Sequence, residues 1–266
     1  MKIGFIGTGN MGGAIIKGYL ASGAGVGNRI TAFDLDSDKL SDLVRKTGIG
    51  IAVDVESLVF SSDIIVLAVK PQNYEDVLPI VAQVIKKRQI VVSMAAGISI
   101  AYIEKFLGNS CKIIRIMPNT PAMVGESMTA ICKNNNVSEK EFDSVVEIFW
   151  SIGKTAAVGE SLMDTVTGVS GSSPAYVYMF IDALAKCAVR NGMLEDDARV
   201  FAAQAVLGAA KMVLDTGIDP LTLRQNVCSP GGTTIEAVEA LQKNGFEDSV
   251  IEGMQAAIDK SRKMTK

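Results

Sequence analysis

The sequence has no histidine among its 266 residues, so the side chain most often used for general acid–base catalysis and metal binding is missing. Its four cysteines lie far apart and form none of the close pairs of zinc or redox sites, so we expect reduced thiols and no metal site. No apolar run approaches the roughly 20 residues that span a bilayer. The net charge of −3 provides no basic surface for nucleic acid. Small molecules and other protein subunits are the expected partners, with no nucleic acid and no membrane.

What is present indicates a globular chain. Hydrophobic residues make up 48% of it and prolines number only 7, which suits one large domain or two modest ones. Residues 1–6 enter a strand-like pattern directly, without a basic leader and an apolar signal segment. We therefore expect a cytoplasmic protein.

The first half alternates short β-branched runs with amphipathic stretches, the pattern of βαβ units around a parallel sheet. The expected strands are residues 2–6, 29–34, 63–69, 89–94, 112–117, 129–132 and 155–158. The expected helices are residues 11–21, 37–46, 74–85, 100–107 and 139–150. This layout predicts a Rossmann-like domain over residues 1–160.

The second half, residues 161–266, is predicted to contain helices only. They are expected at residues 174–190, 195–216, 220–227, 234–242 and 246–264. Small side chains recur at helical spacing in the first two, which permits close helix packing. Either this is a monomeric helical domain or the apolar pair forms a subunit interface, and the pattern favours the interface. The predicted fold class is α/β, with an N-terminal Rossmann-like dinucleotide-binding domain and an all-α C-terminal dimerisation domain.

A glycine-rich turn follows the first expected strand and opens a helix. Such a turn binds a pyrophosphate, because its glycines allow a tight bend and close backbone approach while the helix N-terminus offers free N–H groups. Glycine-rich turns also occur for packing alone, but the context of strand, turn and helix favours dinucleotide binding. The residues of the turn are Gly7, Thr8, Gly9, Asn10, Met11 and Gly12.

Asp34 stands at the end of the second expected strand, about 20 residues after the turn. A carboxylate at this place accepts hydrogen bonds from the adenosine ribose and repels a 2′-phosphate, which favours NADH. Arg29 and Lys39 lie near Asp34 in sequence and weaken this discrimination between NADH and NADPH. Alternatively, Asp34 only caps the loop. The cofactor is therefore expected to be NADPH or NADH.

Three further strands end in turns that meet at one sheet edge, which implies a cleft. Lys70 places a charge near the cofactor or a substrate carboxylate, or it is an ordinary solvated lysine. The candidate cofactor-binding residues in these turns are Ala68, Val69, Lys70, Pro71, Ala95, Ala96, Gly97 and Asn119.

A Gly-Gly turn feeds a helix N-terminus in the second half, at residues 228–234. Its clustered backbone N–H groups suit a carboxylate, although Thr233 and Glu236 have the spacing of a capping box and a capped turn without a ligand is the alternative.

Taken together, five segments resemble pyrroline-5-carboxylate reductases in their order and spacing. They are Gly-Thr-Gly-Asn-Met-Gly at 7–12, Ala-Val-Lys-Pro at 68–71, Met-Pro-Asn-Thr-Pro at 117–121, Ser-Gly-Ser-Ser-Pro-Ala-Tyr at 170–176 and Ser-Pro-Gly-Gly-Thr-Thr at 229–234. The resemblance covers essentially the whole chain. It implies NAD(P)H-dependent reduction of 1-pyrroline-5-carboxylate to L-proline, the last step of proline biosynthesis, by a homodimer or a larger homo-oligomer built on dimers.

The resemblance also implies roles for residues. Thr234 is the expected catalytic residue, hydrogen-bonded to the ring nitrogen. The substrate carboxylate is expected at Ser229, Gly231, Gly232 and Thr233. Val55 and Asp34 depart from the family pattern near the adenosine and place a preference for NADP in doubt.

Two rival functions follow from other classes. A β-hydroxyacid dehydrogenase shares the layout but should carry a catalytic lysine early in the helix after its Gly-Ser-Gly segment, and residues 175–185 contain none. A non-catalytic nucleotide sensor would keep the first turn and would have no reason for the Pro-Gly-Gly-Thr-Thr loop.

Overall fold

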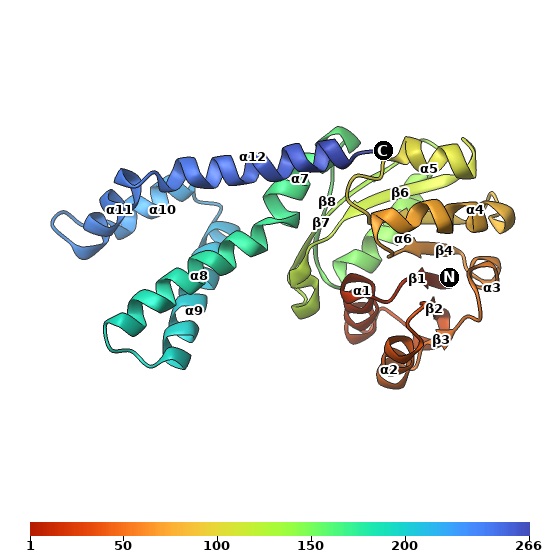
Figure 1. Ribbon diagram of the computed structural model, residues 1–266, viewed down its shortest axis with the longest axis horizontal. Coiled ribbons are helices and arrows are strands. Elements are labelled where there is room, and N and C mark those ends of the chain that lie inside the picture. Colours follow the sequence, from red (N-terminus) through yellow and green to blue (C-terminus); the bar gives the residue numbers. More distant parts are fainter. The chain divides into compact units, whose positions relative to one another are not determined.

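The computed structural model describes residues 1–266, which divide into two compact units (Figure 1). The first unit comprises Met1–Ser172 and Ala257–Lys266, and the second comprises Ser173–Ala256. The sequence-based boundary between residues 160 and 161 lies inside the first unit. Residues 161–172 and the last ten residues therefore pack with the sheet.

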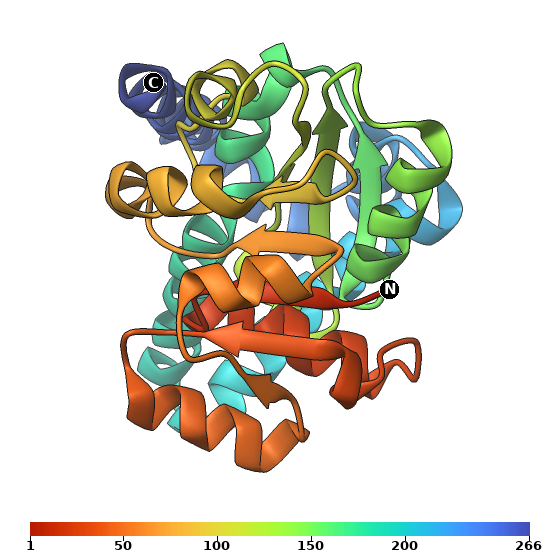
Figure 2. The ribbon, with the colours of Figure 1, turned by 90° about the vertical axis from the view of Figure 1, so that its right-hand side faces the viewer.

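The first unit is built on one eight-stranded sheet of order β3-β2-β1-β4-β5-β6-β7-β8 (Figure 2). Its strands are β1 Ile3–Ile6, β2 Ile30–Phe33, β3 Gly50–Ile51, β4 Ile64–Leu67, β5 Ile90–Ser93, β6 Lys112–Met117, β7 Ser127–Lys133 and β8 Gly153–Ala157. All neighbours are parallel except β6 and β7. The predicted strands are all present. The two-residue strand β3 and the reversal at β7 were not predicted.

Strands β1, β4 and β5 are buried along their whole length. Their sequences, Ile-Gly-Phe-Ile, Ile-Ile-Val-Leu and Ile-Val-Val-Ser, are almost wholly apolar because helices cover both faces of a parallel sheet. Strand β1 lies between β2 and β4, because the chain adds β2 and β3 on one side of β1 and then returns to add β4 on its other side. Ligands of open α/β sheets bind at such a switch point, outside the carboxyl ends of the strands.

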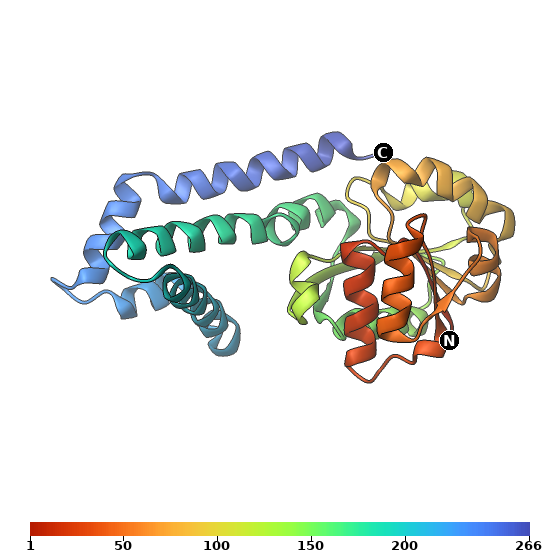
Figure 3. The same cartoon turned by 60° about the horizontal axis from the view of Figure 1, so that its bottom comes forward.

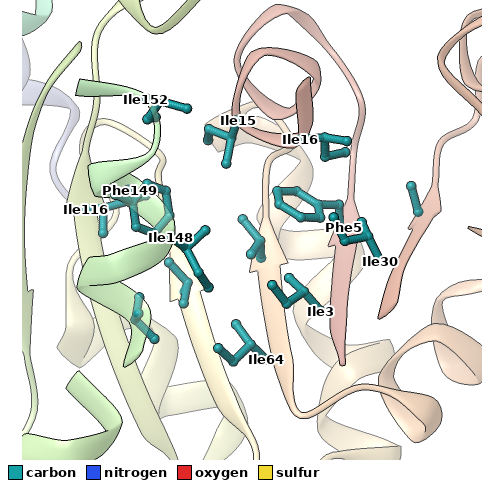
Figure 4. Packing of buried hydrophobic residues seen from close by; sticks show 14 of the residues in the cluster. Ile3, Phe5, Ile15, Ile16, Ile30, Ile64, Ile116, Ile148, Phe149 and Ile152 are labelled. Atoms are coloured by element: carbon teal, nitrogen blue, oxygen red, sulfur yellow. The ribbon is translucent and has the colours of Figure 1, made fainter. Parts of the chain in front are cut away.

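Two groups of helices cover the two faces of the sheet. One core cluster joins the sheet to α1 Asn10–Ala21, α2 Ser37–Thr47 and α6 Glu139–Trp150, and includes Ile15, Phe149 and Ile152 (Figure 4). Helices α1 and α2 lie side by side on this face (Figure 3). The other cluster joins it to α3 Val55–Ser61, α4 Tyr74–Val84 and α5 Ile100–Leu107. Helix α3 was not predicted, because seven residues are too few to show a helical period.

The second unit consists of helices with almost no core of its own. Its helices are α8 Ser173–Arg190, α9 Glu195–Thr216, α10 Pro220–Val227, α11 Thr233–Lys243 and the first half of α12 Phe246–Met264. Only Ala185, Ala198 and Ala202 form a buried cluster there. Large apolar side chains remain more than half exposed, among them Tyr178, Met179, Val200, Phe201, Leu207 and Leu214. A unit of this size cannot leave so much apolar surface in water without a partner.

The helices predicted for the second half are confirmed within a residue at each end. The short helix α7 Met163–Val166 and the π-helical turn Thr167–Gly171 before α8 were not predicted. No helix of the chain combines the length and the apolar character needed to cross a membrane.

Candidate active site

The glycine-rich turn at the end of β1 requires glycine for two separate reasons. Gly7 has a φ of +98°, and a Cβ on it would lie 2.7 Å from the carbonyl oxygen of Ala68. A Cβ on Gly12 would lie 2.6 Å from the carbonyl oxygen of Gly7. A Cβ on Gly9, in contrast, would have no neighbour within 4 Å. Gly7 and Gly12 therefore allow the chain to pack, whereas Gly9 keeps the outer side of the turn open.

The N-terminus of α1 is left without a protein partner of opposite charge. Its N-cap is Gly9, no side chain caps it, and its first turn contains no acidic residue. The free N–H groups and the helix dipole together favour an anion at this place. The turn thus fits the pyrophosphate of a dinucleotide.

Asp34 follows β2 directly and is held by the turn. Its Oδ2 accepts hydrogen bonds from the backbone N–H of Thr8 at 2.6 Å and from the Thr8 hydroxyl at 2.8 Å. Its Oδ1 accepts one from the N–H of Asp36 at 3.0 Å. Partial burial alone would raise the pKa of Asp34, but these hydrogen bonds outweigh it and hold the pKa below its ordinary value. Asp34 is therefore a fixed negative charge beside the turn at neutral pH.

A cleft of about 750 Å³ opens next to Asp34, between the ends of β1, β2 and β4. Its carboxylates outnumber its cations: Asp34, Asp36, Asp54, Glu56 and Asp76 line it together with only Lys39 and Lys70. Lys39 Nζ lies 3.5 Å from Asp36 Oδ2, which neutralises part of that cation. The cleft therefore favours a neutral or cationic group over a phosphate.

The turn of residues 68–71 forms one wall of this cleft. Ala68 and Val69 are half-buried and line it with Lys70, whose side chain is exposed. Val55 also lines it, but is itself 5% exposed because it packs into the core below α3. A second cleft of about 900 Å³ lies on the α1 side and shares Gly9 and Lys39 with the first. The turn is therefore accessible from both sides.

The strand-end residues Ala95, Ala96, Gly97 and Asn119 lie at the carboxyl ends of β5 and β6. Asn119 is 8% exposed and uses both ends of its amide within the protein. Its Nδ2 donates to the carbonyl of Ser170 at 3.1 Å, and its Oδ1 accepts from the N–H of Met128 at 3.0 Å. Its backbone is engaged as well, because the N–H donates to Ser127 Oγ at 3.5 Å and the carbonyl oxygen accepts from the N–H of Ala122 at 3.1 Å. Asn119 thus shapes the end of β6.

The segment of residues 229–234 belongs to the second unit and runs into the first turn of α11. Gly231 has a φ of +71°, so this turn needs glycine there, whereas a Cβ on Gly232 would lie 2.5 Å from Ser229 Oγ and would require that hydroxyl to move. The predicted capping box is wrong. Helix α11 begins at Thr233 with Gly232 as its N-cap, and no side chain caps it. Since Thr233 is already helical, its hydroxyl cannot serve as the cap, and the first N–H groups of α11 stay available to an anion.

Arg115 was not among the site residues predicted from the sequence. It lies on β6 with 3% exposure, and its Nη1 donates to Glu160 Oε1 at 3.1 Å. The same oxygen accepts the N–H of Ile100 at 2.7 Å, at the start of α5. Arg115 Nε and Nη2 are buried and have no partner in the chain. A charged residue between isoleucines in an apolar strand was the available signal.

The fold and these features define the class: a Rossmann-type, dinucleotide-dependent oxidoreductase with a helical unit that needs a partner. Comparison with known proteins agrees with this. The family model "Pyrroline-5-carboxylate reductase dimerisation" matches residues 160–264, and the model "NADP oxidoreductase coenzyme F420-dependent" matches residues 2–97.

Full-length relatives identify the family. The chain is 46% identical to the pyrroline-5-carboxylate reductase of Escherichia coli, over 100% of this chain and 98% of the relative. It is 39% identical to that of Methanosarcina acetivorans, with the same coverage. The crystal structure of Plasmodium falciparum pyrroline carboxylate reductase with NADP bound matches with a TM-score of 0.92 and 32% identity, over 100% of this chain and 98% of the other. The chain belongs to the pyrroline-5-carboxylate reductase family.

Proposed function

We propose that this chain reduces 1-pyrroline-5-carboxylate to L-proline with NADH or NADPH, as the last step of proline biosynthesis. The observation that supports this most is the full-length match to reductases of that name, joined to an open glycine turn at the switch point of the sheet. In this proposal residues 1–160 bind the dinucleotide, and residues 161–266 form the domain for dimerisation and substrate binding. The four free cysteines suit a reducing compartment, which supports a cytoplasmic enzyme.

The proposed roles follow from the geometry of each turn. Gly7, Thr8, Gly9, Asn10, Met11 and Gly12 hold the pyrophosphate, and Asp34 faces the adenosine ribose. Residues 68–71 and 95–97, with Asn119 at the end of β6, line the path towards the nicotinamide. A bound reduced nicotinamide supplies the hydride that goes to the imine carbon.

The substrate is held by the loop before α11. The backbone of Gly231, Gly232 and Thr233, together with Ser229, forms the carboxylate site at the uncapped helix end. The N–H of Gly232 donates to the carbonyl of Ser229 at 3.0 Å and closes the turn, which leaves the N–H groups of Gly231 and Thr233 as donors to the carboxylate. The Thr234 hydroxyl orients the ring nitrogen and helps to protonate it. A protonated imine is already electrophilic, so orientation and hydrogen bonding suffice without a histidine.

The test of the reaction is the oxidation of NADH and NADPH, each followed by absorbance with 1-pyrroline-5-carboxylate. We expect loss of at least one reduced cofactor and formation of proline. No loss of either, from protein that still binds dinucleotide, would overturn the proposal in favour of a nucleotide sensor.

The dimer of this family gives a second prediction. Replacing Phe201, which is 67% exposed on α9, by Ser should weaken the dimer at least about 30-fold, because burying a Phe side chain contributes about 2 kcal/mol. Phe60 in the first unit is 63% exposed and is the matched control. Sedimentation equilibrium should show weaker association for F201S and none of this effect for F60S. Equal dissociation constants for the two variants would place the interface elsewhere.

A further inference from the structure

The last three residues of the described chain close over the turn that follows β5. The backbone N–H of Lys266 donates to the carbonyl of Gly97 at 2.8 Å. Ser99 Oγ donates to the main-chain oxygen of Lys266 at 2.7 Å, while it accepts the N–H of Tyr102 at 3.0 Å as the N-cap of α5. The chain end therefore lies against the start of α5, as Figure 1 also shows.

The Lys266 side chain joins the first turns of two helices. Its Nζ lies 2.6 Å from Glu75 Oε1 on α4 and 5.8 Å from the centre of the Tyr102 ring on α5. Tyr102 also donates to Glu75 Oε1, at 3.3 Å. The hydrogen bond from Lys266 lowers the pKa of Glu75, and the same bond raises the pKa of Lys266, so both are charged at neutral pH. Since both side chains are well exposed, the main-chain contacts matter more than this pair.

Gly97 is shaped for this contact. It has a φ of +73°, and a Cβ on it would lie 2.8 Å from the carbonyl oxygen of Met264 and 3.1 Å from Met264 Cβ. Two backbones thus approach closer than any side chain permits. The glycine is needed for the contact with the chain end as well as for the turn.

The end of α12 is also held by a contact with α7. Ser261 is 4% exposed, and its Oγ donates to Asp164 Oδ1 at 2.6 Å. Thr265 Oγ1 donates to the carbonyl of Ser261 at 3.1 Å. The last residues therefore have a defined position, held by contacts to α7 and within their own helix end.

We propose that residues 264–266 are a positioning strap, which holds the turn of residues 95–97 in the conformation that receives the nicotinamide end of the dinucleotide. This inference rests on the proposed function for the place of the nicotinamide. The strap residues act through the turn and do not touch the reacting atoms. Loss of the strap should therefore weaken binding of the nicotinamide half of the dinucleotide. It should leave binding of the adenosine half unchanged, because Asp34 and the glycine turn hold that half.

Two variants remove the strap in different ways. One is the chain shortened to end at Met264, which removes both main-chain hydrogen bonds of Lys266. The other is Gly97→Ala, which pushes Met264 away. Gly48→Ala is the matched control for the second, because Gly48 has a φ of +70° and a Cβ on it would have no neighbour within 4 Å. Lys266→Met keeps the main-chain bonds and removes only the contacts of the ammonium group with Glu75 and the Tyr102 ring.

The measurement compares calorimetric dissociation constants for NADH and for ADP-ribose, which lacks the nicotinamide, and amide hydrogen exchange of residues 95–100. We expect both strap variants to bind NADH about tenfold more weakly and ADP-ribose within twofold of the unchanged protein, with faster exchange in residues 95–100. Gly48→Ala and Lys266→Met should keep the NADH affinity. Equal weakening of both ligands, or no change in either, would overturn the strap.

The strap and the proposed function fail in different ways. Absence of imine reduction by the unchanged chain would overturn the function, whereas the strap is decided by the two binding constants and by the exchange rates, which need no turnover.

Discussion

Replacing Asp34 by Ser should raise the catalytic efficiency with NADPH about 100-fold relative to that with NADH. In the unchanged chain the ionised carboxylate lies where the adenosine 2′-position is expected, in a cleft with five carboxylates and two lysines. Repulsion between one unit charge of a 2′-phosphate and this carboxylate is about 3 kcal/mol at 6 Å and an effective dielectric of 20. We therefore expect the unchanged chain to prefer NADH.

The readout is the ratio of kcat/KM for the two cofactors, together with their dissociation constants. Asp38→Asn removes the same charge outside the cleft, in the first turn of α2, and should leave the ratio unchanged. The serine variant also loses an acceptor for the buried N–H of Thr8, so its stability should be followed by thermal unfolding. An unchanged cofactor ratio in folded D34S would show that Asp34 only shapes the loop.

Most of the fold was predictable because the apolar residues of its longer strands and helices follow the pattern typical of each element. Strands β1, β4 and β5 are short runs of mostly apolar residues, and α9 and α10 were predicted with their observed bounds. The exceptions are short or depend on distant contacts. Strand β3 has two residues and pairs only with β2, and the antiparallel β7 follows a connection too short for a crossover.

The turns of the candidate site were also visible in the sequence, whereas the contacts between them were not. Glycines at 7, 9 and 12 have the spacing of a dinucleotide-binding turn, and the structure adds that packing requires glycine at 7 and 12, whereas a side chain at 9 would meet no protein atom. Sequence could not show that Thr8 fixes Asp34, that Arg115 and Glu160 join β6 to the start of α5, or that the chain end meets Gly97. These contacts join residues 26 or more positions apart, and no local pattern records them.

The proposed catalytic role of Thr234 predicts the largest change of all. Thr234→Val keeps the shape of the side chain and removes its hydroxyl, and should lower kcat with 1-pyrroline-5-carboxylate about 1000-fold, within the range for loss of a positioned proton donor. Binding of the carboxylate should change less, because the backbone N–H groups before α11 hold it. The loss should shrink as the pH falls, since imine that is already protonated in solution needs less help.

Two further variants separate chemistry from structure. Thr234→Ser retains the hydroxyl and should restore most of the rate. Thr222→Val makes the same replacement in the first turn of α10 and should leave kcat unchanged. The pH dependence of kcat distinguishes a proton-donating hydroxyl from one that only packs, because a packing defect would lower the rate equally at every pH. If T234V turned over within about twofold of the unchanged chain, the ring nitrogen must receive its proton from another group or from water, and the loop would act in binding alone.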